Sequence, residues 1–274
     1  MYKIHRKIIH AALLFIPFIL VFALKVAPGS FTTQYIPIGH PQDLGFSLTC
    51  SDVGAKYAIV KVMSPEIQTP LCDGYMALPD TSWFKIGDSE TLFVDSSDRA
   101  RSKIWTDIPL REELYNQHFD VKVFISANSN GMFQSAIISN YFIETEPKAN
   151  PSKPPLGELG VAPSILECDI KNTTGVFTVF NNDTLSHNYE IAVRIPVSRS
   201  QKFPNISPGF DAISNTGLFS VSPSNFKLAS HSKIQISFRL ISAASFEKST
   251  EAILFITADN GIKNFVRVKF EVGE

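Results

Sequence analysis

Residues 254–272 read LFITADNGIKNFVRVKFEV, and this stretch decides the fold class. Its second half alternates strictly between apolar and charged side chains: Val266, Arg267, Val268, Lys269, Phe270, Glu271 and Val272. A period of two predicts a strand with one face on a core and the other face in solvent. The Asn260-Gly261 pair before it favours a type I′ hairpin, in which both central residues need positive φ. The stretch therefore predicts an antiparallel hairpin at the end of the chain.

A similar order of elements occurs once more in the first half of the chain. Residues 123–133 read VFISANSNGMF, a strand that runs into Asn130-Gly131, and a further strand follows. In each half a Lys-Ile pair opens another strand some twenty residues earlier: Lys103-Ile104 and Lys233-Ile234. Repeated order at low identity indicates one fold used twice.

A proline-rich stretch separates the two halves. Residues 144–160 read ETEPKANPSKPPLGELG and have no apolar periodicity, which predicts a semi-rigid linker. Each half has room for about seven short strands separated by turn signals. We therefore expect an all-β protein of two tandem immunoglobulin-like β-sandwiches, residues 29–146 and 160–274, joined by a linker at 147–159.

The first 28 residues have the composition of an export leader. A basic stretch with Lys3, Arg6 and Lys7 precedes the apolar run IIHAALLFIPFILVFAL. Val21-Phe22-Ala23 fits a cleavage site, but the apolar run of about 17 residues also approaches the length that spans a bilayer. Residues 1–28 are thus either a signal peptide or an N-terminal membrane anchor. Both readings predict an extracytoplasmic protein, periplasmic or at the cell surface, that meets the membrane only through this segment.

The composition narrows the classes of partner and cofactor. The chain is 44% hydrophobic and 19% charged with a formal net charge of −1, so no basic excess attracts nucleic acid. The four histidines beyond the leader show no metal-ligand spacing, and no nucleophile-elbow motif is present. We expect neither a cofactor, a metal nor a catalytic residue, and we expect the protein not to be an enzyme.

Export permits disulfides, and the chain has Cys50, Cys72 and Cys168. Cys50 and Cys72 lie in the same half, and a bond between them would close a loop of about 23 residues, worth ~3 kcal/mol in the chain-entropy model. We predict that bond. Cys168 alternates with charged neighbours in LECDI, which predicts a buried thiol that acts as a small apolar side chain.

Residues 218–240, LFSVSPSNFKLASHSKIQISFRL, carry a recognisable pattern in which an aromatic residue precedes V-x-P-x-x-F-x-L and a strand. The pattern falls on Phe219, Val221, Pro223, Phe226 and Leu228. The second half therefore resembles the bacterial and archaeal extracytoplasmic Ig-like domains related to PapD-like and major-sperm-protein-like sandwiches. The resemblance implies a fold and carries no catalytic residues.

Residues 109–119, PLREELYNQHF, mix apolar, aromatic and charged side chains in a way typical of a contact surface. A single helical turn after Pro109 fits this composition. The candidate contact residues are Leu110, Arg111, Glu112, Tyr115 and Asn116.

Three functions remain open at this stage. The first is a non-enzymatic binding or structural protein of the cell envelope that acts through protein–protein contacts. The second is a periplasmic chaperone that assists assembly of surface structures; it predicts basic residues in a cleft between the sandwiches. The third is a hydrolase attached to a sandwich, which needs a concave site with convergent polar groups.

Overall fold

The computed structural model describes residues 24–51, 55–67, 70–94, 99–129, 136–169, 173–198, 200, 202–241 and 248–271. The Asn130-Gly131 pair and most of the predicted leader lie outside these residues. Within them, no helix is long and apolar enough to cross a membrane.

The described residues of the first half of the chain form ten strands. They are β1 (Lys25–Ala27), β2 (Ser30–Ile36), β3 (Gln42–Ser51), β4 (Ala55–Val62), β5 (Met76–Ala77), β6 (Phe84–Ile86), β7 (Thr91–Phe93), β8 (Arg99–Thr106), β9 (His118–Ser129) and β10 (Ala136–Thr145). One sheet has the order β1-β3-β8-β6, and the other has the order β2-β10-β9-β4-β7 with β5 beside β9. Their inner faces enclose one apolar core, as the alternation along the strands predicts.

The second half repeats this arrangement strand for strand. Its strands are β11 (Leu159–Ala162), β12 (Ile165–Asp169), β13 (Thr174–Asn181), β14 (His187–Arg194), β15 (Asp211–Ala212), β16 (Phe219–Ser222), β17 (Asn225–Leu228), β18 (Ser232–Leu240), β19 (Thr250–Ala258) and β20 (Lys263–Glu271). The sheets are β11-β13-β18-β16 and β12-β20-β19-β14-β17, with β15 beside β19. Adding ten to the number of a strand in the first sandwich gives the number of the equivalent strand in the second. The predicted all-β fold of two immunoglobulin-like sandwiches is confirmed.

Short 3₁₀ turns connect some of the strands. They are η2 (Pro65–Ile67), η3 (Thr81–Trp83), η4 (Glu112–Leu114) and η5 (Thr216–Leu218). The turn η4 is the single helical turn expected after Pro109. The turns η3 and η5 occupy equivalent places before β6 and β16, so the repeat extends beyond the strands.

The core of the second sandwich includes the residues that the C-terminal alternation predicts. Val266, Val268 and Phe270 are fully buried there. The hairpin before them differs from the prediction, because only Gly261 has a positive φ. The Gly261 N–H donates to the Ala258 carbonyl, 2.9 Å away, and the Ala258 N–H donates to the Ile262 carbonyl. The connection is therefore longer than a two-residue type I′ turn, and Gly261 alone takes the left-handed conformation.

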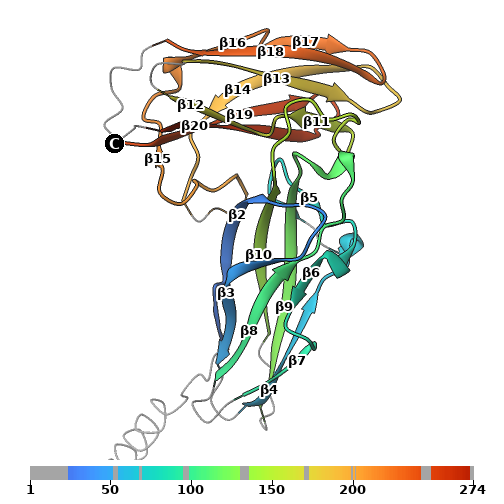
Figure 1. The fold of residues 1–274 in the computed structure, drawn as a ribbon, viewed down its shortest axis with the longest axis vertical. Coiled ribbons are helices and arrows are strands. Elements are labelled where there is room, and N and C mark those ends of the chain that lie inside the picture. The colour runs from blue at the N-terminus through green and yellow to red at the C-terminus, as the bar shows by residue number, and fades with distance from the viewer. Residues whose placement is uncertain are drawn as a thin grey trace, which may run out of the picture.

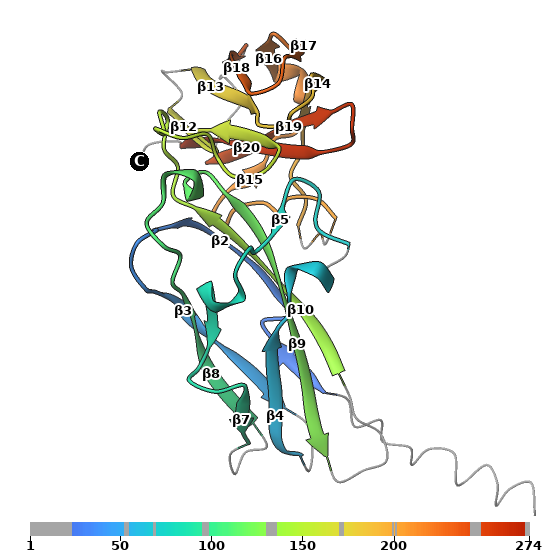
Figure 2. The ribbon, with the colours of Figure 1, turned by 90° about the vertical axis from the view of Figure 1, so that its right-hand side faces the viewer.

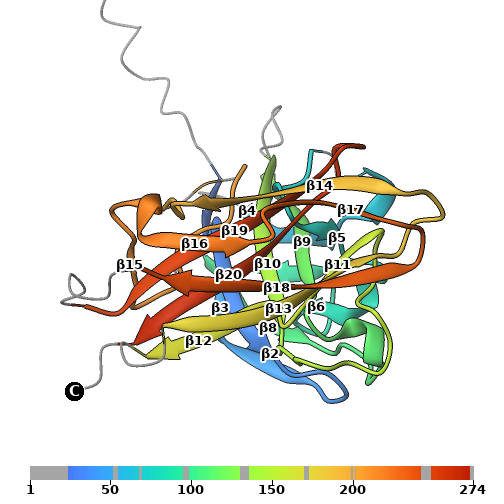
Figure 3. The same cartoon turned by 90° about the horizontal axis from the view of Figure 1, so that it is seen from above.

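The second sandwich lies across one end of the first. Figure 1 shows β9 and β10 of the first sandwich rising toward β19 and β20 of the second, and Figure 2 shows the same contact after a quarter turn. Seen from above, the strands of the second sandwich run across the end of the first (Figure 3). The outer face of the sheet that holds β19 and β20 is thus covered by the first sandwich.

Candidate functional site

The junction between the sandwiches contains a charged side chain that solvent does not reach. Arg267 lies on the outer face of β20 and has no exposed surface. We expected a solvated side chain here, and that expectation is wrong. The strand alternation places Arg267 on the outer face correctly, but the first sandwich covers that face.

Two carboxylates from different sandwiches neutralise Arg267. Its Nε and Nη2 donate to the two oxygens of Glu144 at the end of β10, each at 2.6 Å. Its Nη1 donates to Glu251 of β19 at 2.8 Å and to the Asn205 carbonyl at 2.7 Å. Both carboxylates are fully buried, and Glu251 also accepts from the Ser207 hydroxyl at 2.7 Å. The arginine therefore ties the first sandwich to two parts of the second.

Burial and charge act in opposite directions on these groups. Burial raises the pKa of Glu144, but the attraction of Arg267 and its hydrogen bonds outweigh burial and hold that pKa below the ordinary value. Burial likewise disfavours the charged form of Arg267, and the carboxylates of Glu144 and Glu251 outweigh it, which raises the arginine pKa well above its ordinary value. Glu144 and Arg267 consequently keep their charges in the folded protein.

An aromatic cluster surrounds this network. The turn Cys72–Tyr75, here called the Gly74 turn, brings Tyr75 against Phe142 of the first sandwich and Phe265 of the second, with ring centroids 5.0 and 5.2 Å apart. Six side chains form a continuous buried cluster: Cys72, Tyr75, Phe142, Ile253, Phe255 and Phe265. The Tyr75 hydroxyl donates to Glu144 at 2.5 Å, so the aromatic and ionic contacts form one unit.

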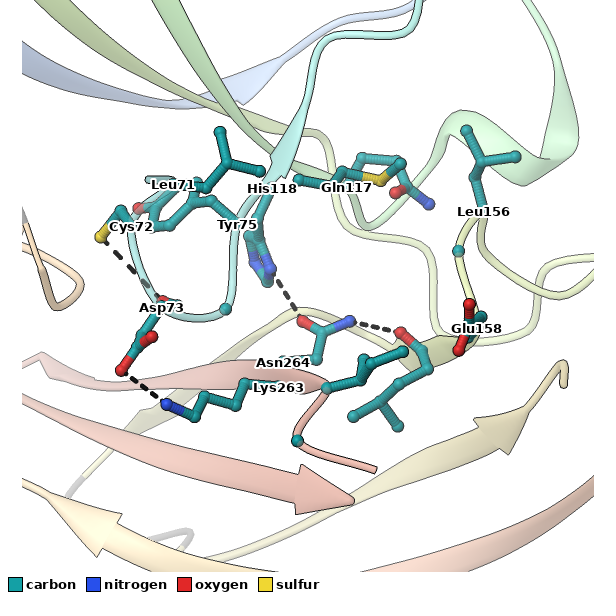
Figure 4. Close-up of a pocket in the computed structure, with 16 residues that line it drawn as sticks. Leu71, Cys72, Asp73, Tyr75, Gln117, His118, Leu156, Glu158, Lys263 and Asn264 are labelled. Atoms are coloured by element: carbon teal, nitrogen blue, oxygen red, sulfur yellow. Dashed lines mark hydrogen bonds and ion pairs between the residues drawn. The ribbon is translucent and has the colours of Figure 1, made fainter. Parts of the chain in front are cut away.

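A cavity of about 420 Å³ lies beside this cluster (Figure 4). On its wall, the Nδ1 of His118 is 3.0 Å from Asn264 Oδ1, and the Asn264 amide donates to the Leu159 carbonyl. Lys263 forms an ion pair with Asp73, 2.9 Å away, across the boundary between the sandwiches. Burial lowers the pKa of His118 to about 4, so its ring is neutral at neutral pH. These polar side chains are partners of one another and hold the sandwiches together.

Three of the predicted contact residues, Glu112, Tyr115 and Asn116, contact the linker. Glu112 accepts from the Lys148 ammonium at 2.7 Å and from the Ser152 N–H at 3.0 Å. The Lys148 ammonium also lies over the Tyr115 ring, 4.6 Å from its centroid. These side chains fasten residues 147–159 to the first sandwich.

Asn116 is the clearest departure from the predicted contact surface, because it is only 1% exposed. It therefore cannot bind a partner. Leu110 and Arg111 do reach solvent, although Arg111 pairs with Glu113 at 2.6 Å.

The predicted Cys50–Cys72 disulfide is wrong. Both residues are buried thiols that form no disulfide, and so is Cys168. Cys50 lies in the core of the first sandwich and pairs with Ala100 and Val26, near the strand ends that point away from the second sandwich. Cys72 belongs to the aromatic cluster at the junction. Sequence separation alone did not reveal that the two cysteines belong to opposite ends of one sandwich. The prediction for Cys168, a buried thiol, is confirmed.

Three large apolar side chains are exposed on the outer face of the sheet that holds β9 and β10. Ile138 of β10 lies opposite Phe124 of β9, and they are 51% and 37% exposed. Phe93 of the edge strand β7 lies on the same face and is 79% exposed. These three residues define the β9–β10 face. Large exposed apolar groups that gather on one sheet are typical of an interaction surface.

A second charged cluster lies at a turn of the second sandwich, where β14 begins beside the end of β19. His187 Nε2 is 2.8 Å from Asp183 and its Nδ1 is 2.7 Å from Asp259. Hydrogen bonds to Asp183 and then to Asp259 raise the pKa of His187 above its ordinary value. Among the described residues, no group of three or more His, Cys, Asp or Glu side chains is arranged to hold a metal ion.

The raised pKa of His187 predicts a pH dependence of stability. The contribution of His187 to the free energy of unfolding is fully present below the pKa of the unfolded state, about 6.5. It is lost as the pH rises through the higher pKa of the folded state. We expect the free energy of unfolding of the native protein to fall over this range, and His187→Gln to remove that fall. Urea unfolding at a series of pH values measures it. Asp183→Asn with Asp259→Asn is the matched control and should also remove the fall; an unchanged slope in either variant would contradict the assignment.

Comparisons with known proteins identify no family for this chain. No family model and no curated protein matches the chain. Among solved structures, the chain is similar to the periplasmic chaperone SfaE, at 9% identity and a TM-score of 0.33, over 42% of this chain and 58% of that one. It is similar to the PapD-like domain of human CEP192, at 13% identity and a TM-score of 0.30, over 45% and 90%. A carbohydrate binding protein described as putative, from Bacteroides ovatus, shares 11% identity and a TM-score of 0.35, over 88% and 68%.

These structures are PapD-like and other β-sandwich proteins, the class that the pattern at 218–240 resembles. In this chain Phe219 and Leu228 of that pattern are buried in the core of the second sandwich. The chain spans little more than half the length of SfaE, and it spans 54% of the E. coli chaperone DraB.

Proposed function

We propose that this protein is a non-catalytic binding or structural protein of the cell envelope that acts through protein–protein contacts. The observation that carries the proposal is the β9–β10 face, with Phe93, Phe124 and Ile138 exposed together on one sheet. A soluble fold gains nothing from exposing these side chains to water, whereas a partner that covers them gains their transfer free energy. The leader-like composition of residues 1–28 supports an extracytoplasmic location.

The buried junction supports this proposal, because it makes the two sandwiches one body. Ionic, aromatic and linker contacts all join them, so a partner bound on the β9–β10 face meets a preorganised surface and loses less entropy on binding. Rigid sandwiches that present a face are well suited to holding a partner and need no catalytic group.

The chaperone alternative predicts basic side chains between the sandwiches that can receive a partner's carboxylate. Arg267 and Lys263 do lie between the sandwiches, but Arg267 is fully buried by Glu144 and Glu251, and Lys263 pairs with Asp73. A carboxylate from outside would have to displace these internal partners. The geometry thus favours the first function over the chaperone.

Photo-crosslinking at single positions tests the proposal. A photoreactive phenylalanine analogue replaces Phe124 in the full chain in its own cells, and the same analogue at Leu185 is the control, because Leu185 is 63% exposed on the other sandwich. We expect a discrete adduct from position 124 and none from position 185. Equal labelling at both positions, or no adduct at position 124, would contradict a specific contact on this face.

A further inference from the structure

The contact between the two sandwiches pairs a glycine turn with an apolar strand pair. The Gly74 turn presses against the outer face of β19 and β20 so closely that a Cβ added to Gly74 would lie 2.6 Å from Phe265 and 3.5 Å from Phe255. Phe255 and Phe265 are opposite one another in the ladder. Only a residue without a side chain permits this approach.

The second sandwich contains a counterpart of that turn. The Gly209 turn, Ser207–Phe210, precedes β15 as the Gly74 turn precedes β5. In both, the aromatic N–H donates back to the first residue's carbonyl, at 3.0 Å for Tyr75 and 3.2 Å for Phe210. Both glycines have a left-handed backbone, with φ of 85° and 84°.

Both turns are held by the same kind of hydrogen bond, from the N–H of the first turn residue to a carboxylate on the neighbouring strand. The Cys72 N–H donates to Asp120 of β9 at 2.9 Å, and the Ser207 N–H donates to Glu251 of β19 at 2.7 Å. Asp120 and Glu251 occupy the same place in the repeat, four residues before Phe124 and Phe255. The turn and its support have thus been repeated together with the fold.

The tip of the Gly209 turn, Pro208-Gly209, is exposed and has no partner surface of the kind that covers the Gly74 turn, whereas Ser207 at its base is buried and donates to Gln34 of β2, 3.0 Å away. A Cβ added to Gly209 would meet nothing within 4 Å. The apolar strand pair has a counterpart as well: by the repeat, Phe124 corresponds to Phe255, and Ile138, its ladder partner, corresponds to Phe265. Both Phe124 and Ile138 are exposed. One turn and one strand pair are joined inside the chain, whereas the tip of the equivalent turn and the equivalent strand pair are both exposed.

We propose that the Gly209 turn of one copy of this protein docks on Phe124 and Ile138 of a second copy, in the way that the Gly74 turn docks on Phe255 and Phe265 within the chain. This inference rests on the proposed function, because it names the partner of the β9–β10 face. The contact joins different surfaces of the two copies, so each copy keeps one open turn and one open face. Such a heterologous contact continues head to tail and builds a linear assembly unless the rotation closes a ring.

The contact between copies is weaker than the contact within the chain. The residue that corresponds to Arg267 is Asn140, and the residues that correspond to the Asp73–Lys263 ion pair are Pro208 and Ala136, so neither ionic contact is repeated. No linker holds two copies together either. We therefore expect reversible, concentration-dependent association with a Kd between ~1 µM and ~1 mM.

Sedimentation velocity across that concentration range tests the inference with three single variants of the chain without residues 1–23. Ile138→Lys places a charge on the face, Pro208→Lys places one on the exposed turn, and Leu185→Lys is the matched control at an exposed site elsewhere. The native chain and Leu185→Lys should form a ladder of oligomers. The other two variants should each weaken association by about tenfold or more. A native chain that stays monomeric throughout, or Pro208→Lys that assembles like the native chain, would overturn the inference.

Mixing the two impaired variants separates a head-to-tail contact from a symmetric one. Ile138→Lys keeps its turn and Pro208→Lys keeps its face, so the mixture should form a one-to-one dimer and no longer species. A face-to-face dimer predicts that Pro208→Lys alone associates normally, and this result would reject the proposed geometry. A crosslinked adduct at position 124 with a different protein, together with a monomeric native chain, would leave the proposed function in place and reject only this inference.

Discussion

Replacing Arg267 by methionine should lower the free energy of unfolding by about 3 to 5 kcal/mol, because the change leaves two buried carboxylates without their common partner. Methionine keeps most of the apolar length of the arginine side chain and removes only the guanidinium. Glu144 and Glu251 would then repel each other in a site that solvent does not reach. Guanidinium chloride unfolding, followed by the fluorescence of Trp83 and Trp105 and by far-ultraviolet circular dichroism, measures the loss.

The matched control removes the charges together. Arg267→Met combined with Glu144→Gln and Glu251→Gln leaves no buried charge, so much of the lost stability should return. Arg267 joins Glu144 of the first sandwich to Glu251 of the second. In the single variant Arg267→Met, we therefore expect the two sandwiches to unfold in separate transitions. A loss below about 1 kcal/mol for Arg267→Met would mean that the network is open to water in solution.

The repeated fold could be predicted because alternation reports directly on which face of a strand meets a core. The pairs Lys103-Ile104 and Lys233-Ile234 do lie in equivalent strands, β8 and β18. The register of alternation also places Arg267 on the outer face. It does not reveal what covers that face, because the covering residues come from the other half of the chain.

One signal for the junction is present in the sequence. The strand TEAILFITA is apolar on both faces, with Ile253 and Phe255 outward and Leu254 and Ile256 inward. Strands that are apolar throughout are typical of sheets covered on both sides, so β19 could have been predicted as a buried strand. The glycine turns CDGYMA and SPGFDA show little similarity as letters, and only the structure shows that Gly74 and Gly209 are equivalent.

The contact segment 109–119 shows why the candidate site was only partly predictable. Its mixture of aromatic and charged side chains indicates a contact surface, and in the structure Glu112, Tyr115 and Asn116 contact the linker of the same chain. Composition does not distinguish an internal contact from one with a partner, because both need the same groups. The β9–β10 face could not be predicted from the sequence. Phe124 lies within VKVFISA, where the alternation of the inward residues Val121, Val123 and Ile125 accounts for most of the apolar pattern.

Asn116→Ala is expected to cost about 3 kcal/mol, although Asn116 is far from any proposed binding surface. The Asn116 Oδ1 accepts from the Lys148 N–H at 2.9 Å and from the Ser164 N–H at 3.0 Å, and its Nδ2 donates to the Lys148 carbonyl at 2.8 Å. Alanine leaves these backbone groups without their partner. It also tolerates the positive φ of 62° at this position less well than asparagine does.

Two further variants divide this cost between the backbone and the side chain. Asn116→Gly accepts the positive φ but loses all three hydrogen bonds, whereas Asn116→Asp keeps the two accepted bonds and replaces the donated one by a carboxylate oxygen that repels the Lys148 carbonyl. The expected order of stability is native, then aspartate, then glycine, then alanine. Because these bonds hold the linker, limited trypsin digestion should cut after Lys148 slowest in the native protein, faster in the aspartate variant, faster again in the glycine variant and fastest in the alanine variant. The three substitutions weaken the hydrogen bonds between Asn116 and Lys148 to different degrees. Equal cleavage rates in all four proteins would therefore contradict a role of Asn116 in holding the linker, and would leave that role to Glu112 and Tyr115.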